Sequence, residues 1–277
     1  MRQRLRLTIP ATLVLTAIAV FFSCKNDPAN TPAAQNPYAS PDLLGGHWIA
    51  MDFCRRANQY GSVVRAMDAA PTPFAYGITF TTIKPDSVTC SNGLEEWTLG
   101  VKYRKDTLEM PKAMGDRSAF WIYDSGGDRK LTLFGVENNS VYLHEYIKSS
   151  AGATNGLLAF RTALNANLFS GAFFLIGDKS QEQILFTPGG FINGFEPFDR
   201  YEVCVNDDCF VTRALENFDI MTLRNSKKEG AETLFAWQYN ANADTLTLYK
   251  LRNTNPEEKG AYARDGVAYR FLRKKPF

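Results

Sequence analysis

Histidine is scarce in this chain, with only His47 and His144 among 277 residues. Metal sites and acid–base sites use histidine often, so two residues leave little material for either. Neither histidine belongs to a recognisable nucleophile motif. The glycine-rich segment Ser125–Asp128 is not followed by Gly-Lys-Ser/Thr, so it fits a hairpin turn better than a phosphate-binding loop. The sequence therefore predicts no catalytic residues, no metal ligands and no cofactor.

An excess of charge is also missing. The chain has 31 Lys and Arg against 29 Asp and Glu, a net charge of +2, and the charges are interspersed. No nucleic-acid partner is indicated.

The acidic pairs Glu95-Glu96 and Asp207-Asp208 are adjacent in sequence, so in a strand their side chains would point to opposite faces. A glycosidase needs two facing carboxylates about 5–9.5 Å apart, and the sequence locates no such pair.

Long apolar runs are absent except near the beginning of the chain. The uncharged stretch from Leu7 to Phe22 contains Pro10 and is shorter than the roughly 20 residues that a membrane-spanning helix needs. Arg2, Arg4 and Arg6 precede it, an arrangement typical of a secretory signal. An uncleaved N-terminal anchor and ordinary secretion are the alternatives.

Cys24 stands where this signal would be cleaved. The residues Phe21-Phe22-Ser23-Cys24 resemble a bacterial lipobox, in the relaxed form found in Bacteroidota lipoproteins. The resemblance implies that residues 1–23 are a lipoprotein signal peptide and that Cys24 is lipidated. It also implies an outer-membrane location, on the periplasmic or cell-surface face, with the membrane as partner through the N-terminal lipid. Nothing in the sequence indicates the oligomeric state.

From the cysteine onward, residues 24–43 combine prolines with Ala, Asn and Ser, a composition typical of a flexible tether. The rest of the chain has short alternating apolar runs separated by Gly, Asn and Asp, which predicts β-structure. Predicted strands in the first half are Gly77–Thr82, Glu96–Tyr103, Ala119–Tyr123, Lys130–Val136 and Val141–Ile147.

The order of these runs repeats. Ile184–Thr187 resembles Ile78–Thr81, and Phe235–Asn240 resembles Ala119–Asp124, with further parallels later in each half. Gly171-Ala172-Phe173-Phe174 similarly parallels Gly46-His47-Trp48-Ile49. We therefore predict two β modules, residues 44–149 and 167–277, joined by a linker at 150–166. A chance resemblance between two β meanders is the alternative.

Two helices are expected beside the strands. Asn155 is a suitable N-cap for a short helix over Gly156–Leu164 in the linker. Apolar residues recur at helical spacing between Phe53 and Met67, although Gly61 and the pair Val63-Val64 make an irregular loop nearly as acceptable.

Four cysteines besides Cys24 remain, and an even number in an exported chain suggests two disulfides. Of three pairings we favour Cys54–Cys90 and Cys204–Cys209, because each pair then stays within one module. Cys204 and Cys209 flank a polar turn and would face each other across two strand ends. Four free buried thiols are the alternative, and a zinc site fits the spacings poorly.

A module that opens on Gly46-His47-Trp48, meanders through some eight strands and ends in an aromatic-rich strand resembles a lipocalin. It is similar in particular to lipocalin-like domains of Bacteroidota lipoproteins. The second module departs from the pattern, because Phe173 replaces the tryptophan. The resemblance implies an all-β chain of two tandem antiparallel meander barrels with short helical insertions. It also implies that the segment after Trp48 covers the barrel mouth, pinned by Cys54–Cys90.

Candidate ligand contacts are aromatic and basic. Trp121 and Tyr123 share one strand face, as do Trp237 and Tyr239. These rings would line a pocket or form a sugar platform, or else pack in the core.

Arg55 and Arg56, with Arg65, would meet an anionic ligand or simply lie in solvent.

Together these features predict an exported, membrane-anchored lipoprotein that binds a small apolar or glycan ligand without catalysis. The alternatives are a surface polysaccharide hydrolase and a structural envelope protein with no small ligand.

Overall fold

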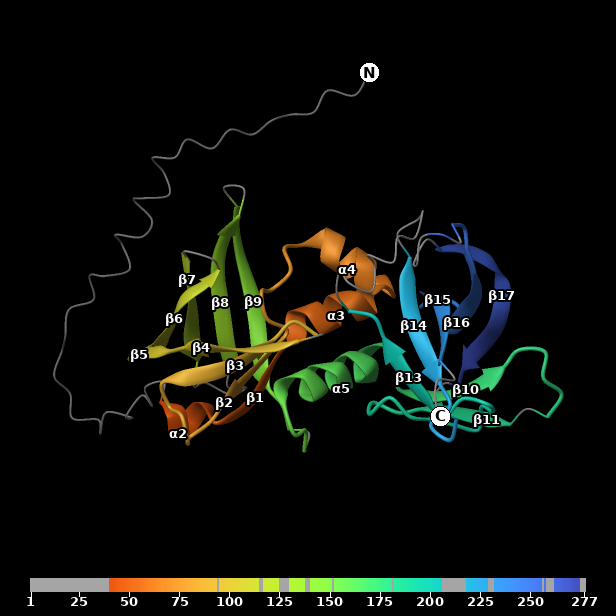
Figure 1. Ribbon diagram of the computed structural model, residues 1–277, viewed down its shortest axis with the longest axis horizontal. Coiled ribbons are helices and arrows are strands. Elements are labelled where there is room, and N and C mark those ends of the chain that lie inside the picture. Colours follow the sequence, from red (N-terminus) through yellow and green to blue (C-terminus); the bar gives the residue numbers. More distant parts are fainter. Residues whose placement is uncertain are drawn as a thin grey trace, which may run out of the picture. The chain divides into compact units, whose positions relative to one another are not determined.

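The computed structural model describes residues 40–93, 95–114, 117–124, 130–137, 140–150, 152–180, 182–205, 218–228, 232–255, 257 and 262–274. The signal segment, Cys24 and Cys209 lie outside these residues. The described residues fold mostly into antiparallel strands, with four helices among them. Figure 1 shows the strands gathered into two barrel-shaped sheets.

The first sheet has nine strands in the order β4-β3-β2-β1-β9-β8-β7-β6-β5, and it carries three helices. Its elements are α2 (Pro41–Leu44), β1 (Gly46–Ala50), α3 (Met51–Tyr60), α4 (Val63–Ala69), β2 (Gly77–Phe80), β3 (Ser87–Ser91), β4 (Glu96–Gly100), β5 (Lys102–Arg104), β6 (Thr107–Met114), β7 (Arg117–Asp124), β8 (Lys130–Glu137) and β9 (Ser140–Lys148).

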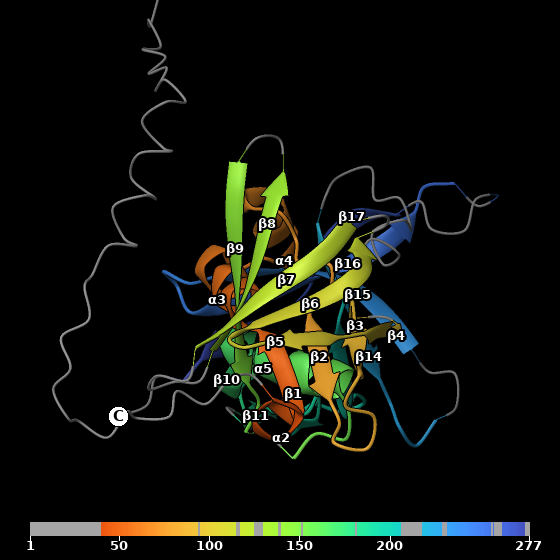
Figure 2. The same ribbon diagram turned by 90° about the vertical axis from the view of Figure 1, so that its left-hand side faces the viewer.

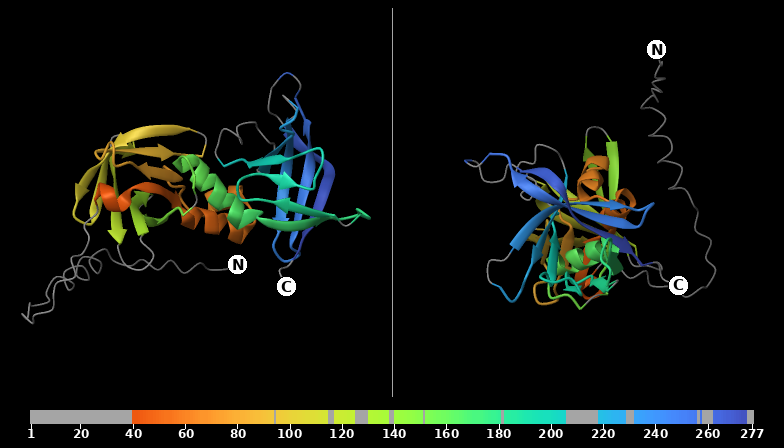
Figure 3. Two further views of the ribbon diagram at one scale, coloured as in Figure 1. Left: turned by 90° about the horizontal axis from the view of Figure 1, so that it is seen from below. Right: turned by 90° about the vertical axis from the view of Figure 1, so that its right-hand side faces the viewer.

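The second sheet has eight strands in the order β12-β11-β10-β17-β16-β15-β14-β13. Helix α5 leads directly into it (Figure 3). Its elements are α5 (Gly156–Leu168), β10 (Gly171–Leu175), β11 (Gln183–Phe186), β12 (Ile192–Asn193), β13 (Arg200–Val203), β14 (Asp219–Arg224), β15 (Glu232–Asn240), β16 (Thr245–Asn253) and β17 (Tyr262–Arg273).

Both sheets are antiparallel meanders in which the first strand also pairs with the last. In the first sheet β1 lies between β2 and β9, and in the second β10 lies between β11 and β17. Each sheet therefore curls into a nearly closed barrel. This confirms the predicted fold of two tandem antiparallel barrels with short helical insertions.

The first barrel closes at a corner that the sequence did not predict. The run Glu96–Tyr103 was expected to be one strand, but it is divided at Val101 into β4 and β5, which form opposite edges of the sheet. Val101 is buried, and its amide donates to the carbonyl of Asp86 at 2.8 Å. Val101 alone connects β4 at one edge of the sheet to β5 at the other. Figure 2 shows β5, β6, β7 and β8 side by side in this order.

The internal repeat is preserved in strand register. Gly46 pairs with Phe80 between β1 and β2, and Gly171 pairs with Phe186 between β10 and β11. Both glycines have positive φ angles, +113° and +139°, a conformation that side chains rarely adopt. The weak sequence parallel between the two openings therefore corresponds to the same backbone conformation at the same place in each barrel.

A cation covers the opening aromatic ring in each barrel. Lys148 Nζ lies 6.0 Å from the centre of the Trp48 ring and donates to the carbonyl of Leu43. Arg273 lies 5.1 Å from the centre of the Phe173 ring and donates at 2.6 Å to the last carbonyl of α5. Each cation thus joins the last strand of its barrel to the helix that precedes the first strand.

The helices agree in part with expectation. The predicted helix in the linker is confirmed, since the Asn155 side chain accepts a hydrogen bond from the amide of Leu158, and the helix continues to Leu168. Between Phe53 and Met67 the chain forms two helices, α3 and α4, separated at Gly61. Gly61 has φ +57°, and a Cβ there would lie 2.6 Å from the carbonyl oxygen of Tyr239 in the second barrel.

The expected Cys54–Cys90 disulfide is wrong, because both residues are free buried thiols. Cys54 lies on α3, which packs on β9 and α5, whereas Cys90 lies inside β3 opposite Ile78 and Trp97. A disulfide requires two Cα atoms within about 7 Å of each other and Cα–Cβ bonds that point toward each other. Two cysteines on separate elements meet this condition only where the two elements contact each other at those cysteines. Cys204 is disulfide-bonded, while its predicted partner Cys209 lies outside the described residues, so that pairing stays a prediction.

Candidate functional site

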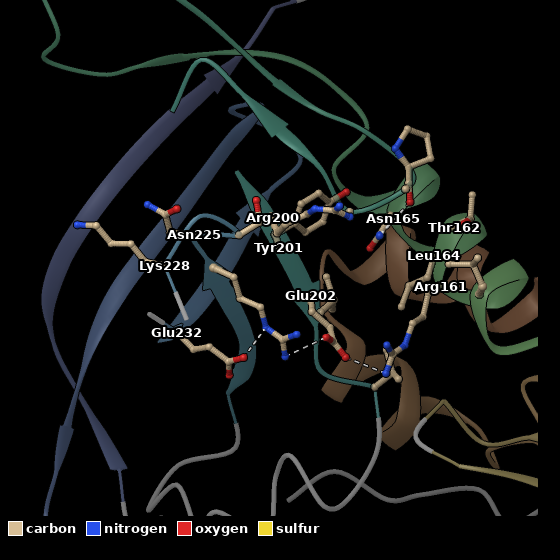
Figure 4. Close-up of a pocket in the computed structure, with 18 residues that line it drawn as sticks. Arg161, Thr162, Leu164, Asn165, Arg200, Tyr201, Glu202, Asn225, Lys228 and Glu232 are labelled. Atoms are coloured by element: carbon tan, nitrogen blue, oxygen red, sulfur yellow. Dashed lines mark hydrogen bonds and ion pairs between the residues drawn. The ribbon is translucent and has the colours of Figure 1, made fainter. Parts of the chain in front are cut away.

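A pocket of about 450 Å³ lies beside the second barrel, between α5 and the strands β13, β14 and β15 (Figure 4). Its volume falls in the range of roughly 300–1,000 Å³ that small-molecule sites occupy. The two sides of the pocket come from different parts of the chain, a helix before the barrel and a sheet edge within it.

One face of α5 forms a wall of the pocket. Leu158, Arg161, Thr162 and Asn165 all line it. These residues are spaced by three or four positions, which places them on one side of an α-helix. The opposite face carries Phe160, which stacks on Tyr76 with ring centres 4.7 Å apart. The helix therefore packs through Phe160 against Tyr76, a residue just before β2 of the first barrel, and its polar face lines the pocket.

The floor of the pocket holds a chain of alternating charges. Glu232 binds Arg224 at 3.0 Å, Arg224 binds Glu202 at 3.3 Å, and Glu202 binds Arg161 at 2.8 Å. The dashed lines of Figure 4 follow this chain from Glu232 to Arg161. The four side chains are each about a third to a half exposed, so each pair contributes only about 0–1 kcal/mol to stability. Their main effect is to hold the side chains in place.

A tight turn forms the rim beside α5. Tyr201 donates its hydroxyl to the carbonyl of Thr187 at 2.7 Å, and Asn165 Nδ2 donates to the carbonyl of Pro188 at 3.0 Å. Burial raises the pKa of the Tyr201 phenol, so the hydroxyl keeps its proton and remains a donor. Gly190 in the same turn has φ +80°, and a Cβ would lie 2.9 Å from the Tyr201 carbonyl oxygen. Only glycine fits there without displacing the backbone.

Arg200 lies at the seam where the second barrel closes. It forms an isolated antiparallel bridge with Phe191, next to the edge strands β12 and β13. Its guanidinium lies 3.5 Å from the centre of the Phe191 ring. The neighbouring Asp199 accepts hydrogen bonds from the amide and the hydroxyl of Ser226, and these bonds lower the pKa of its carboxyl. Asp199 thereby ties the seam to the turn that follows β14.

The predicted aromatic contacts lie inside the barrels. Trp121 and Tyr123 share the buried face of β7, and Trp121 meets Tyr146 edge to face with ring centres 6.4 Å apart. Trp237 and Tyr239 share the buried face of β15, and Trp237 meets Phe169 edge to face at 4.8 Å. The predicted pairing of faces is correct. As ligand contacts these four residues stay predictions, since Trp121, Tyr123 and Trp237 pack against other core rings and Tyr239 lies against Arg273 and Asp244.

The predicted basic contacts have protein partners. Arg55 binds Glu145 at 2.6 Å, and Arg56 binds Asp52 at 3.1 Å and the carbonyl of Ala66 at 3.2 Å. Each arginine therefore already forms an ion pair with a carboxylate, and Arg56 also donates a hydrogen bond to a backbone carbonyl. Their role toward an anionic ligand stays a prediction, and neither lies in the pocket beside α5.

Sequence reasoning missed the residues that line the pocket. Arg200 and Glu202 alternate on one strand and therefore share a face, and Arg161 and Asn165 are one helical turn apart. These local patterns were available in the sequence. Nothing local, however, indicates that this strand and this helix face each other.

The described residues contain no group of three or more His, Cys, Asp or Glu side chains that could hold a metal ion. Nor does any helix among them have the length and apolar character needed to cross a membrane. Comparison with known proteins finds no matching family model and no significant match among curated proteins or solved structures.

Proposed function

We propose that the chain is a lipoprotein anchored to the outer membrane through Cys24, which binds a small glycan without catalysis. The two barrels are taken as lipocalin-like domains on a flexible tether. The repeated opening of each barrel supports this view, since Gly46 and Gly171 begin strands that pair with the last strand of the same barrel.

The observation that carries the proposal is the pocket beside α5. It offers a cavity of about 450 Å³ with guanidinium, carboxylate, amide and hydroxyl groups on its walls. Such groups match the hydroxyls of a sugar better than they match an acyl chain or a sterol. An apolar ligand inside a barrel is the less favoured alternative, because aromatic side chains already pack there. Trp121 packs against Tyr146 in the first barrel, and Trp237 packs against Phe169 in the second.

Hydrolysis is the second candidate, because Glu202 and Glu232 bring two carboxylates to one pocket. Both carboxylates bind the same guanidinium, that of Arg224. The arginine therefore occupies the position between them that a scissile bond would need. A binding site explains this arrangement more directly than a catalytic one. A structural envelope protein with no small ligand is the remaining alternative.

The anchor is tested by growing the expressing bacterium with a radiolabelled fatty acid. We expect label on the wild-type protein, outer-membrane fractionation of that protein, and neither in the variant Cys24→Ala. Wild-type protein without label, or label retained by Cys24→Ala, would overturn the anchoring proposal.

The ligand is tested by thermal unfolding of the purified protein with neutral oligosaccharides, acidic oligosaccharides and fatty acids. A ligand that binds only the folded state raises Tm in proportion to its occupancy. We expect a shift with an oligosaccharide and none with fatty acids. A shift with fatty acids alone would assign the ligand to the apolar class, and turnover of an oligosaccharide would show an enzyme.

A further inference from the structure

We propose that the pocket beside α5 recognises an acidic group, a carboxylate, sulfate or phosphate carried on a saccharide. This inference rests on the proposed function and names the ligand class for the same site.

Positive charge exceeds negative charge on the described walls of the pocket. Its basic lining residues are Arg161, Arg200, Arg224 and Lys228, and its acidic ones are Glu202 and Glu232. A concave site with an excess of one charge concentrates ligands of the opposite sign. The imbalance therefore favours an anion.

The excess charge is confined to two side chains. Glu202 and Glu232 are both engaged, by Arg161 and Arg224, in the charge chain that crosses the floor. Within the described part of the chain, Arg200 and Lys228 form no ion pair. These two cations are therefore the ones available to a ligand.

Arg200 has a geometry suited to an oxyanion. It stands directly opposite Arg224 in the register of β13 and β14, and like charges in that position repel. Glu202 and Glu232 neutralise Arg224, but neither reaches Arg200 in the described structure. The neighbouring Asp199 also attracts Arg200, but its carboxylate accepts hydrogen bonds from Ser226 and forms no ion pair with Arg200 among the described residues. An anion bound at Arg200 would therefore reduce the repulsion further.

The Phe191 ring also prepares Arg200 for binding. The guanidinium carbon lies 3.5 Å from the ring centre, a contact that restricts the side chain. The N–H groups of a guanidinium lie in its plane, so a ring over its face leaves them able to bind a ligand. Oxyanions bind such a planar edge with two parallel hydrogen bonds. Thr162 and Asn225 line the same pocket and supply hydroxyl and amide groups for the sugar ring, as Figure 4 shows.

The test measures binding of oligogalacturonate and of its neutral methyl ester to the purified protein by calorimetry. A chondroitin sulfate oligosaccharide and inorganic phosphate are the further probes. We expect the acidic saccharides to bind and the ester to bind at least tenfold more weakly, because a charged hydrogen-bonded pair typically gives about a tenfold effect or more. Binding should weaken as salt is raised from 0.05 to 0.5 M.

Three variants locate the site. Arg200→Ala is expected to lower the affinity for acidic saccharides roughly tenfold, and Arg200→Lys to keep part of it because the charge remains. Arg252→Ala removes an exposed arginine of β16 outside the pocket and should leave binding unchanged. Unfolding curves for each variant separate a loss of binding from a loss of folding.

The outcomes separate the two proposals. Equal binding of acid and ester, unaffected by Arg200→Ala, would overturn the anion proposal and retain the glycan site. Phosphate binding that is as tight as saccharide binding and is lost in Arg200→Ala would support the anion site and assign it to the free ion. Absence of binding by every saccharide would overturn both proposals.

Discussion

Asp219 Oδ1, on β14 of the second barrel, accepts a hydrogen bond of 2.7 Å from the backbone amide of Val63, at the start of α4. The same oxygen accepts a second bond of 3.0 Å from the amide of Val64. Helix α4 belongs to the insertion that follows β1 of the first barrel. One carboxyl group of the second barrel therefore accepts hydrogen bonds from the first two backbone amides of a helix that belongs to the first barrel. Asp219 is only 6% exposed, and this burial raises the pKa of its carboxyl despite the hydrogen bonds.

We expect Asp219→Ala to lower the free energy of unfolding by about 1–3 kcal/mol, because it leaves the buried amide of Val63 without an acceptor. Asp219→Asn should cost less, since its amide oxygen can accept the same bonds. Urea unfolding followed by tryptophan fluorescence measures both. A loss in Asp219→Asn as large as that in Asp219→Ala would contradict the role of the oxygen.

The raised pKa also predicts how stability depends on pH. The folded state binds the Asp219 proton more tightly than the unfolded state, whose carboxyl has the ordinary value of 3.8. The resulting contribution to stability is complete below this value and is lost as pH rises through the folded-state pKa. Asp219→Asn lacks this contribution. The unfolding free energy of wild type minus that of the variant should therefore fall as pH rises from about 4, and a difference that rises would contradict the prediction.

Two buried tryptophans provide a matched pair for measuring a single hydrogen bond. Trp48 donates its indole N–H to the carbonyl of Leu44 at 2.7 Å, whereas Trp121 Nε1 is buried with no hydrogen-bond partner in the described structure. Replacement by Phe removes the same indole atoms from a fully buried side chain at both positions. We expect Trp48→Phe to cost about 1 kcal/mol more than Trp121→Phe, which removes an unsatisfied donor.

Chemical denaturation of the two variants, each compared with wild type, gives the difference directly. Near-ultraviolet circular dichroism serves as the control that both barrels remain packed. Equal losses, or a larger loss in Trp121→Phe, would show that Trp121 has a partner that the described residues do not contain.

The fold could be predicted from the sequence because its signals are local. Short apolar runs bounded by polar residues indicated β7 and β15, the period of two in a strand placed Trp121 with Tyr123 and Trp237 with Tyr239 on one face, and Asn155 marked the start of α5. The corner at Val101 was missed because Glu96–Tyr103 alternates without interruption. Its position depends on closure of the barrel, which brings distant edges together and leaves no local pattern.

The pocket could not be predicted, and the cysteines show a similar reason. Arg161 and Glu202 meet only because α5 packs beside the second barrel, a contact between distant segments. Cys54 and Cys90 were assigned to each other because they lie in one module, yet they lie on different elements of it. Sequence spacing indicates which residues share a face or a module, and it does not indicate which faces meet.

Arg273 and Lys148 occupy equivalent positions but differ in the strength of their contacts. Arg273 donates to the Leu168 carbonyl at 2.6 Å, and Lys148 donates to the Leu43 carbonyl at 3.3 Å. We expect Arg273→Ala to lower the free energy of unfolding by about 2 kcal/mol, and Lys148→Ala by less than about 1 kcal/mol. Arg273→Lys should recover part of the loss. Urea unfolding of the three variants tests this, and equal losses in the two alanine variants would contradict it.

The buried thiols of Cys54 and Cys90 should be unreactive in the folded protein. Burial raises the pKa of Cys90 to about 12 and raises that of Cys54 as well, so at pH 8 almost no thiolate is present at either position. Because the thiolate is the reacting species, we expect an alkylating reagent to leave both residues unmodified until denaturant is added. Peptide mapping after alkylation, without reduction, follows each cysteine separately, with Cys54→Ala and Cys90→Ala as controls for assignment. A cross-linked peptide containing both residues would contradict the free thiols of the structure and restore the disulfide that the sequence suggested.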